Sequence, residues 1–176
     1  MIRICLTGVE STGKTWASVP LAQRFGGVVL PEFGREWAET VGNDYGTPQL
    51  RAIAAIHAAR RARLIAAGPR VIIEDTDVVM TQAWHMMLHG VRDPVLAAMP
   101  ADADAYLLFS PDVPWLADGT RAFGGSERAR FHAVVQAELA ARGITPILIN
   151  GPWRQRLGQA GAAIAAMLAS TTTPRQ

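Results

Sequence analysis

The stretch Gly8-Val9-Glu10-Ser11-Thr12-Gly13-Lys14-Thr15 decides the fold. It matches the spacing G-x-x-x-x-G-K-[ST] at every fixed position, which is the pattern of a phosphate-binding loop, or P-loop. Glycines let backbone N–H groups turn inward around phosphate oxygens. We expect Lys14 to reach the β- and γ-phosphates of ATP and the Thr15 hydroxyl to ligate Mg²⁺. The predicted nucleotide-binding residues are Gly8, Glu10, Ser11, Thr12, Gly13, Lys14 and Thr15.

Apolar runs alternate with helical patterns along the rest of the chain. Five short apolar runs predict strands, at 2–6, 28–30, 71–73, 105–109 and 146–149. Helices are predicted over 15–25, 47–68, 78–89, 126–142 and 153–169. This alternation favours an α/β fold of the P-loop NTPase type, with a parallel five-stranded sheet covered by helices on both faces. We predict one domain over residues 1–169 and a flexible tail over 170–176.

The composition is that of an ordinary globular domain, with 49% hydrophobic and 18% charged residues. A net charge of +2 is small for a nucleic-acid-binding protein, so we expect no nucleic-acid partner. The one local basic cluster, Arg60, Arg61 and Arg63, is interpreted as the solvated face of a helix. No run of 18 apolar residues occurs, so we expect no membrane partner and a cytoplasmic location. The sequence leaves a homo-oligomer possible.

Lys14 is the only lysine among the 17 basic residues. GTPases read guanine through an [NT]-K-x-D motif, which needs a second lysine. Motor ATPases usually end a strand with Asp-Glu, whereas the third predicted strand here ends in the reverse order, Glu74-Asp75. The signature of ABC-type ATPases is also missing. These exclusions leave the nucleoside and nucleotide kinases.

A kinase of this kind needs carboxylates near the acceptor hydroxyl and Mg²⁺, together with a clamp for its substrate. Glu32 and Arg35 follow the second predicted strand, and Asp75 and Asp77 follow the third. Ligands bind at the carboxyl ends of strands in such sheets. We therefore predict Glu32 and Arg35 as substrate residues and Asp75 and Asp77 as catalytic residues. An aspartate here can bind Mg²⁺ or accept the hydroxyl proton, and the sequence leaves both roles open for each.

The segment 114–121 is a candidate lid over the transferred phosphoryl group. Arg121 and Arg128 are predicted to stabilise charge on the γ-phosphoryl group, with Arg128 counted among the nucleotide-binding residues. The alternative is a surface loop with an arginine salt bridge. Asp118 in this segment and Trp84, which could stack on a flat base, complete the predicted substrate residues, although a tryptophan on a helix is often a core residue.

In combination these motifs resemble the ribosylnicotinamide (nicotinamide riboside) kinase domain of the bacterial NadR type and the AAA-like ATPase family around it. The resemblance covers nearly the full chain. Beyond the P-loop it is carried by Glu32-Phe33-Gly34-Arg35-Glu36, Asp75-Thr76-Asp77, Thr81-Gln82-Ala83-Trp84, Pro94, and Pro114-Trp115 with Asp118-Gly119 and Arg121.

The resemblance implies transfer of the ATP γ-phosphoryl group to the 5′-hydroxyl of nicotinamide riboside, giving nicotinamide mononucleotide for NAD salvage. It also implies that Glu32 and Arg35 lie near the riboside, that Asp75 and Asp77 lie near Mg²⁺ or the acceptor hydroxyl, and that Arg121 acts from the lid. Relatives commonly carry an aromatic residue before the glutamate, where this chain has Pro31. A kinase for another nucleoside or small alcohol, or a regulatory ATP-binding module, therefore stay as alternatives.

Overall fold

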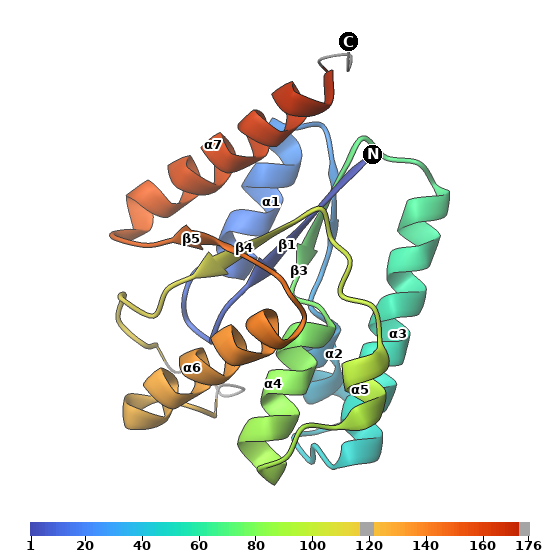
Figure 1. The fold of residues 1–176 in the computed structure, drawn as a ribbon, viewed down its shortest axis with the longest axis vertical. Coiled ribbons are helices and arrows are strands. Elements are labelled where there is room, and N and C mark those ends of the chain that lie inside the picture. The colour runs from blue at the N-terminus through green and yellow to red at the C-terminus, as the bar shows by residue number, and fades with distance from the viewer. Residues whose placement is uncertain (117–121, 173–176) are drawn as a thin grey trace.

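The computed structural model describes residues 1–116 and 122–172. At its centre is a five-stranded sheet in the order β2-β3-β1-β4-β5 (Figure 1). All four strand pairings are parallel, which confirms the predicted sheet. The strands are β1 (Ile2–Thr7), β2 (Val28–Leu30), β3 (Val71–Asp75), β4 (Ala105–Phe109) and β5 (Ile147–Ile149).

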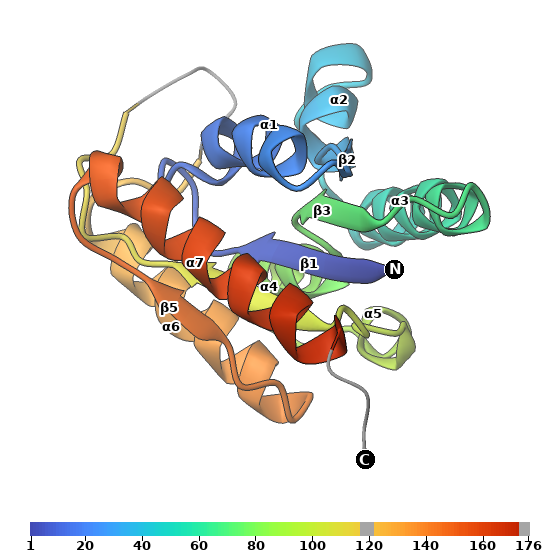
Figure 2. The ribbon, with the colours of Figure 1, turned by 90° about the horizontal axis from the view of Figure 1, so that it is seen from above.

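Helices cover both faces of this sheet (Figure 2). They are α1 (Lys14–Arg24), α2 (Phe33–Thr40), α3 (Thr47–Ala66), α4 (Val78–His89), α5 (Pro94–Ala98), α6 (Gly125–Ala141) and α7 (Trp153–Thr172). One core cluster joins the sheet to α1 and α7, and a second joins it to α4 and α6. Within the described ranges, no helix combines the length and the apolar character needed to cross a bilayer.

The alternation of side chains in β1 explains this layering. Ile4 and Leu6 belong to the cluster with α1 and α7, whereas Cys5 belongs to the cluster with α4 and α6. Successive residues of a strand point to opposite faces, and all six residues of β1 are buried because both faces are covered. β1 is thus the central strand, and the loop that follows it opens at the middle of the sheet edge.

Two short helices were not predicted from the sequence. α2 begins three residues after β2, and α5 begins at Pro94 with the Asp93 carboxylate accepting the Leu96 N–H at 2.9 Å. α7 continues to Thr172, three residues beyond the predicted end of the last helix. Residues 173–176 of the predicted tail lie outside the described residues.

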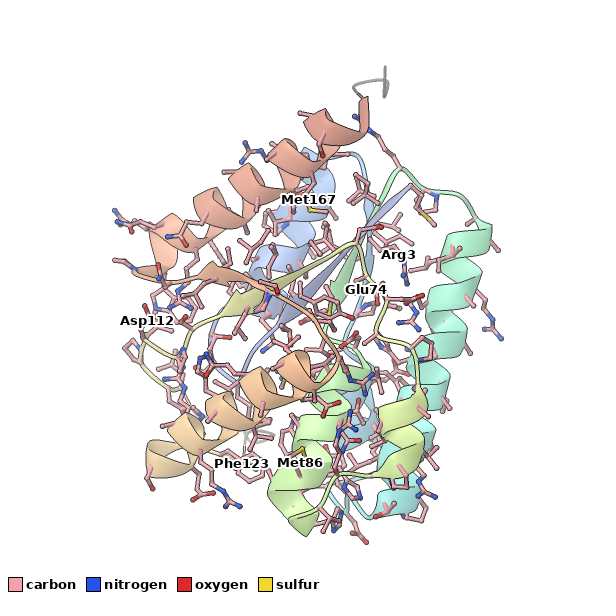
Figure 3. All side chains as sticks on the ribbon, in the orientation of Figure 1. Arg3, Glu74, Met86, Asp112, Phe123 and Met167 are labelled. Atoms are coloured by element: carbon pink, nitrogen blue, oxygen red, sulfur yellow. The ribbon has the colours of Figure 1, made fainter. Side chains whose placement is uncertain are left out.

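The interpretation of the arginine cluster as a solvated face is wrong for Arg61, which is buried. Its guanidinium lies 3.7 Å from the carboxylate of Glu74 on β3, and Arg3 on β1 lies 3.5 Å from the same carboxylate. Figure 3 shows Arg3 and Glu74 side by side between the sheet and α3. Arg61 is therefore buried beside a charged partner, Glu74, which lies on another element and which the helical pattern alone does not reveal.

Candidate active site

The P-loop connects β1 to α1, and contacts within the protein hold its shape. Gly8 and Gly13 have φ values of 125° and 93°, in the region that favours glycine. A Cβ atom at Gly8 would lie 2.5 Å from the Phe109 carbonyl oxygen, so a side chain there would displace β4. Lys14 is buried and its Nζ donates to the Val9 carbonyl at 2.9 Å. The lysine is thus positioned inside the loop, where a phosphate chain would lie.

Two buried arginines brace the loop from its outer side. Arg128 donates to the carbonyl oxygens of Val113 at 2.5 Å and Ser11 at 3.1 Å. It is not among the residues that line the pocket described below. Arg156 on α7 donates to the Thr12 carbonyl at 3.0 Å. The structure thus places Arg128 on the loop backbone, and its predicted contact with the γ-phosphoryl group stays a prediction.

A pocket of about 740 Å³ opens in front of the loop. This volume suits a ligand of nucleotide size. The predicted residues that line it come from the P-loop, from the segment after β2, from the segment after β3 and from α4: Gly8, Glu10, Ser11, Thr12, Gly13, Lys14, Thr15, Glu32, Arg35, Asp77 and Trp84. The structure therefore brings residues that are far apart in the sequence to one cavity.

Glu32 and Asp75 form a pair of carboxylates beside Lys14. Burial and the charge of Asp75 raise the pKa of Glu32 to about 7, although Lys14 and Arg35 act in the opposite direction. Burial also raises the pKa of Asp75, against the charge of Lys14 and a hydrogen bond from Thr15. Two carboxyl groups near a lysine at the end of a P-loop can divide proton transfer and metal binding between them.

Thr15 and Asp75 fit a Mg²⁺ ion. Mg²⁺ prefers oxygen ligands and takes few of them from the protein, since water and phosphate oxygens fill the rest of its shell. Asp75 Oδ1 is buried and has no hydrogen-bond partner among the described residues. No group of three or more His, Cys, Asp or Glu side chains in the described ranges is arranged to hold a metal ion. Thr15 and Asp75 therefore suit an ion that arrives with the nucleotide.

Asp77 has a different environment from Asp75. One of its carboxylate oxygens accepts the Val79 N–H at 2.9 Å and caps α4, while the other accepts the Tyr106 hydroxyl at 2.6 Å. Both oxygens of Asp77 thus have a partner inside the protein, although the residue lines the pocket.

The pocket also contains an aromatic pair. The ring centroids of Tyr45 and Trp84 are 5.8 Å apart, and Trp84 further contacts Phe123 and Phe131 at 4.9 Å and 5.5 Å. Trp84 therefore packs against the core and also lines the pocket, and its stacking on a base stays a prediction. The charge of Glu32 contributes to a raised pKa of Tyr45, which places this aromatic wall near the carboxylates.

Asp118 and Arg121 lie outside the described residues. The chain on either side of them is attached to the P-loop. Ser11 Oγ accepts the Leu116 N–H at 2.9 Å. The Glu10 carboxylate accepts the N–H groups of Ala122 and Phe123, both at 3.1 Å. Glu10 and Ser11, predicted to bind the nucleotide, thus also fasten the flanks of the predicted lid.

The comparison that decides the family is a match over residues 3–156 to the family described as AAA domain. The chain belongs to the AAA domain family. It is also 30% identical over 129 residues to the trifunctional NAD biosynthesis/regulator proteins NadR of Salmonella typhimurium (strain LT2) and Escherichia coli (strain K12). These alignments cover 70% of this chain and 32% of each relative, so the chain spans about a third of the curated relatives it matches.

Solved structures support the fold over nearly the whole chain. NadR in complex with NR has a TM-score of 0.77 at 19% identity, and the match covers 99% of this chain and 53% of that one. NadR with NAD and AMP-PNP has a TM-score of 0.71 at 18% identity and covers 99% and 51%. A thymidylate kinase from Ehrlichia chaffeensis has a TM-score of 0.60 at 12% identity and covers 95% and 98%. The resemblance to a NadR-type P-loop domain is confirmed.

The sequence reasoning missed several residues of this AAA domain's pocket. Tyr45 lies in the stretch between α2 and α3, which carries no motif. His57 is buried on α3 and lines the pocket, and burial together with the charge of Arg61 lowers its pKa to about 4. Leu50 and Ile53 line the pocket from the same helix. Leu50, Ile53 and His57 stand at positions i, i+3 and i+7, so helical periodicity could have identified His57 as part of the helix face that lines the pocket.

Proposed function

We propose that this protein is an ATP-dependent small-molecule kinase that transfers the γ-phosphoryl group to the 5′-hydroxyl of a nucleoside. Nicotinamide riboside is the acceptor we favour, with nicotinamide mononucleotide as the product. The observation that carries the proposal is that Lys14 of the P-loop, Glu32 and an aromatic wall line one cavity, while the charge of Asp75 acts on Glu32 from beside it. Similarity to proteins named for NAD biosynthesis, and to NadR solved with NR, supports this acceptor.

In the proposed mechanism Lys14 and the loop N–H groups hold the β- and γ-phosphates. Thr15 and Asp75 would hold Mg²⁺, which supplies charge neutralisation at the phosphates when bound. Glu32 accepts the proton of the 5′-hydroxyl as its oxygen attacks the γ-phosphorus and the bond to the β-phosphate oxygen breaks. A carboxylate with a pKa of about 7 is well matched to this role near neutral pH. Arg35 orients the acceptor, and Arg121 acts on the transferred group.

The aromatic and acidic character of the acceptor region favours a cationic ring. Nicotinamide riboside carries a pyridinium cation, and such a cation is attracted to the faces of Trp and Tyr rings. Trp84 and Tyr45 lie at the pocket wall, and Glu32 lies near Tyr45. Pro31 occupies the position where NadR-type relatives carry an aromatic residue, so these two rings are proposed to supply the stacking surface instead.

The alternative acceptor is another nucleoside. A deoxyadenosine kinase from M. mycoides has a TM-score of 0.57 at 10% identity and covers 96% of this chain and all of its own. Kinases with different named acceptors therefore share this fold, and the acceptor pocket alone selects among them.

The test is ATP consumption with Mg²⁺ and a panel of nicotinamide riboside, the common ribo- and deoxyribonucleosides, and no acceptor. We expect strong stimulation by nicotinamide riboside and formation of nicotinamide mononucleotide. Stimulation only by another nucleoside would contradict nicotinamide riboside as the acceptor but would still support the proposed kinase activity. Equal turnover with and without every acceptor would contradict the kinase and favour a regulatory ATP-binding module.

Lys14→Ala is the negative control for this panel. We expect at least about a 100-fold loss of kcat, because a preorganised cation at the phosphates is removed. The thermal midpoint should stay near that of the wild type, since the hydrogen bond of Lys14 Nζ goes to a carbonyl of the loop, that of Val9. Near-normal turnover in this variant would show that the P-loop does not hold the reacting phosphates.

A further inference from the structure

Two tryptophans at the rim of the pocket have no part in the proposed mechanism. Trp16 directly follows Thr15 in the first turn of α1 and is 58% exposed. Trp153 is the first residue of α7, and a Cβ atom at Gly13 would lie 2.6 Å from its Cζ3 atom. Both indoles line the same pocket as Lys14. They therefore adjoin the phosphate site directly.

The helices that carry these indoles begin at the same place. Trp153 of α7 touches Gly13 at the start of α1, and a Cβ atom at Gly161 of α7 would lie 2.5 Å from Arg24 Nη1 at the end of α1. The two helices thus run side by side in the same direction, on the same face of the sheet (Figures 1 and 2). Their amino-terminal turns present Trp16 and Trp153 at one end of the pair.

The sheet order separates this end from the acceptor residues. The P-loop follows the central strand β1, Glu32 follows β2 at one edge of the sheet, and Trp153 follows β5 at the other edge. A nucleotide with its phosphates on Lys14 and its γ-phosphoryl group toward Glu32 extends its base in the opposite direction. The base of the donor therefore falls on the side of Trp153.

The backbone groups of the turn between β5 and α7 are largely hydrogen-bonded within the protein. The Asn150 N–H and carbonyl bond the Gln159 side chain at 3.1 Å and 2.9 Å. The Gly151 N–H donates to Asp112 at 2.6 Å, and its carbonyl accepts from Arg156 Nε at 2.8 Å. Pro152 has no N–H to offer. These backbone groups are engaged within the protein, whereas both indoles line the pocket, with the Arg156 guanidinium 5.7 Å from the centroid of the Trp153 ring.

We propose that Trp16 and Trp153 form the base subsite of the phosphate donor, which they hold by stacking, so that purine and pyrimidine nucleoside triphosphates are accepted with little discrimination. The inference rests on the phosphate site of the proposed function and is independent of the acceptor. Stacking on aromatic side chains tolerates any base because every base has a π face, and purines should bind somewhat more tightly than pyrimidines.

The test is equilibrium binding of ATP, GTP, CTP and inorganic tripolyphosphate, each with Mg²⁺ and without acceptor. In the wild type we expect the three nucleotides to bind within about 10-fold of one another, since one stacking contact differs little between bases. In Trp16→Ala and Trp153→Leu we expect ATP binding to weaken by about 5- to 100-fold, while tripolyphosphate binding stays unchanged because it has no base. Trp153→Phe keeps a flat ring and should retain most of the affinity.

Trp37→Phe is the matched control, because Trp37 lies on α2 and is not among the pocket-lining residues. Equal weakening of ATP and tripolyphosphate would overturn the proposal and assign Trp153 to support of the P-loop alone. Unchanged ATP binding in both variants, or a wild-type preference for ATP over GTP above about 100-fold, would overturn it as well, since stacking does not discriminate so strongly. If no acceptor stimulates turnover, the proposed kinase fails while these binding results still stand.

Discussion

At the scale of single residues, Asp75 and Asp77 stand two positions apart but differ in what their carboxylates contact. Asp75 Oδ1 has no hydrogen-bond partner among the described residues, whereas both oxygens of Asp77 do. Thr76 between them has a φ value of 67°, uncommon for a β-branched residue, and its N–H donates to the Leu6 carbonyl at 3.0 Å. The segment is thus fixed by β1. We therefore propose Asp75 as the Mg²⁺ ligand, whereas Asp77 anchors α4.

Asparagine substitutions separate these two roles. Asp75→Asn should lower kcat by at least about 100-fold, because a charged ligand of the metal is removed. Asp77→Asn should keep kcat within about 5-fold, since the amide oxygen can still accept the Val79 N–H, and should lower stability by about 1 kcal/mol. Turnover and urea unfolding of both variants measure this difference. Equal losses of kcat would instead support a catalytic Asp77.

The residues that could be predicted are those whose role depends on local spacing. Lys14 and Thr15 belong to a continuous motif, so the geometry of the loop follows from adjacent residues. Arg156 braces the same loop from 144 positions away, and nothing in its local sequence distinguishes it from a surface arginine. Arg128 was predicted as a phosphate ligand from its residue type, and its contacts with the carbonyl oxygens of Val113 and Ser11 could not be predicted because only the folded chain brings these groups near.

At the scale of elements, Glu74 links β3 to its neighbours through charge. It is fully buried, and its contacts with Arg3 on β1 and Arg61 on α3 are 3.5 Å and 3.7 Å long. Burial raises the pKa of Glu74 to about 7, because the two arginines at these distances do not offset its loss of water. Glu74 therefore opposes folding when it is ionised.

Glu74→Gln makes this cost measurable as a pH dependence. The folded-state pKa of about 7 exceeds the ordinary value of 4.5, so the folded protein binds more protons between these values. The wild type should thus lose stability relative to the variant as pH rises from 4.5 through 7, by about 3 kcal/mol in total. Urea unfolding of both proteins between pH 4.5 and 8 gives the difference. A difference that does not change with pH would contradict the raised pKa.

The long elements were predictable and the short ones were not. α3 and α4 have enough turns to show an apolar face, and their predicted bounds agree with the structure to within two residues. α5 has five residues, too few for a periodic pattern. Its start nevertheless carries a signal that could have been used, since Asp93 followed by Pro94 is a favourable cap and first helical position.

At the scale of the whole molecule, the strand order separates the proposed acceptor residues from the proposed base subsite of the donor. β1 holds the P-loop at the centre, β2 and β3 carry the proposed acceptor residues on one side, and β5 leads to Trp153 on the other. The acceptor region and the region of Trp153 both adjoin Lys14 in the pocket. Both faces of the sheet are closed by apolar clusters that need no metal, so stability and Mg²⁺ binding should be separable properties of this fold.

Thermal unfolding with and without Mg²⁺ tests that separation. EDTA should leave the midpoint of the apoprotein unchanged, because the clusters are built from side chains alone. ATP with Mg²⁺ at 100 times its dissociation constant should add about 2.7 kcal/mol and raise the midpoint by about 5–10 °C. ATP with EDTA, or ATP with Mg²⁺ on Asp75→Asn, should raise it much less. A lower midpoint in EDTA alone would reveal a structural metal. An equal rise of the midpoint with ATP in the presence and in the absence of Mg²⁺ would contradict the assignment of Thr15 and Asp75 as Mg²⁺ ligands.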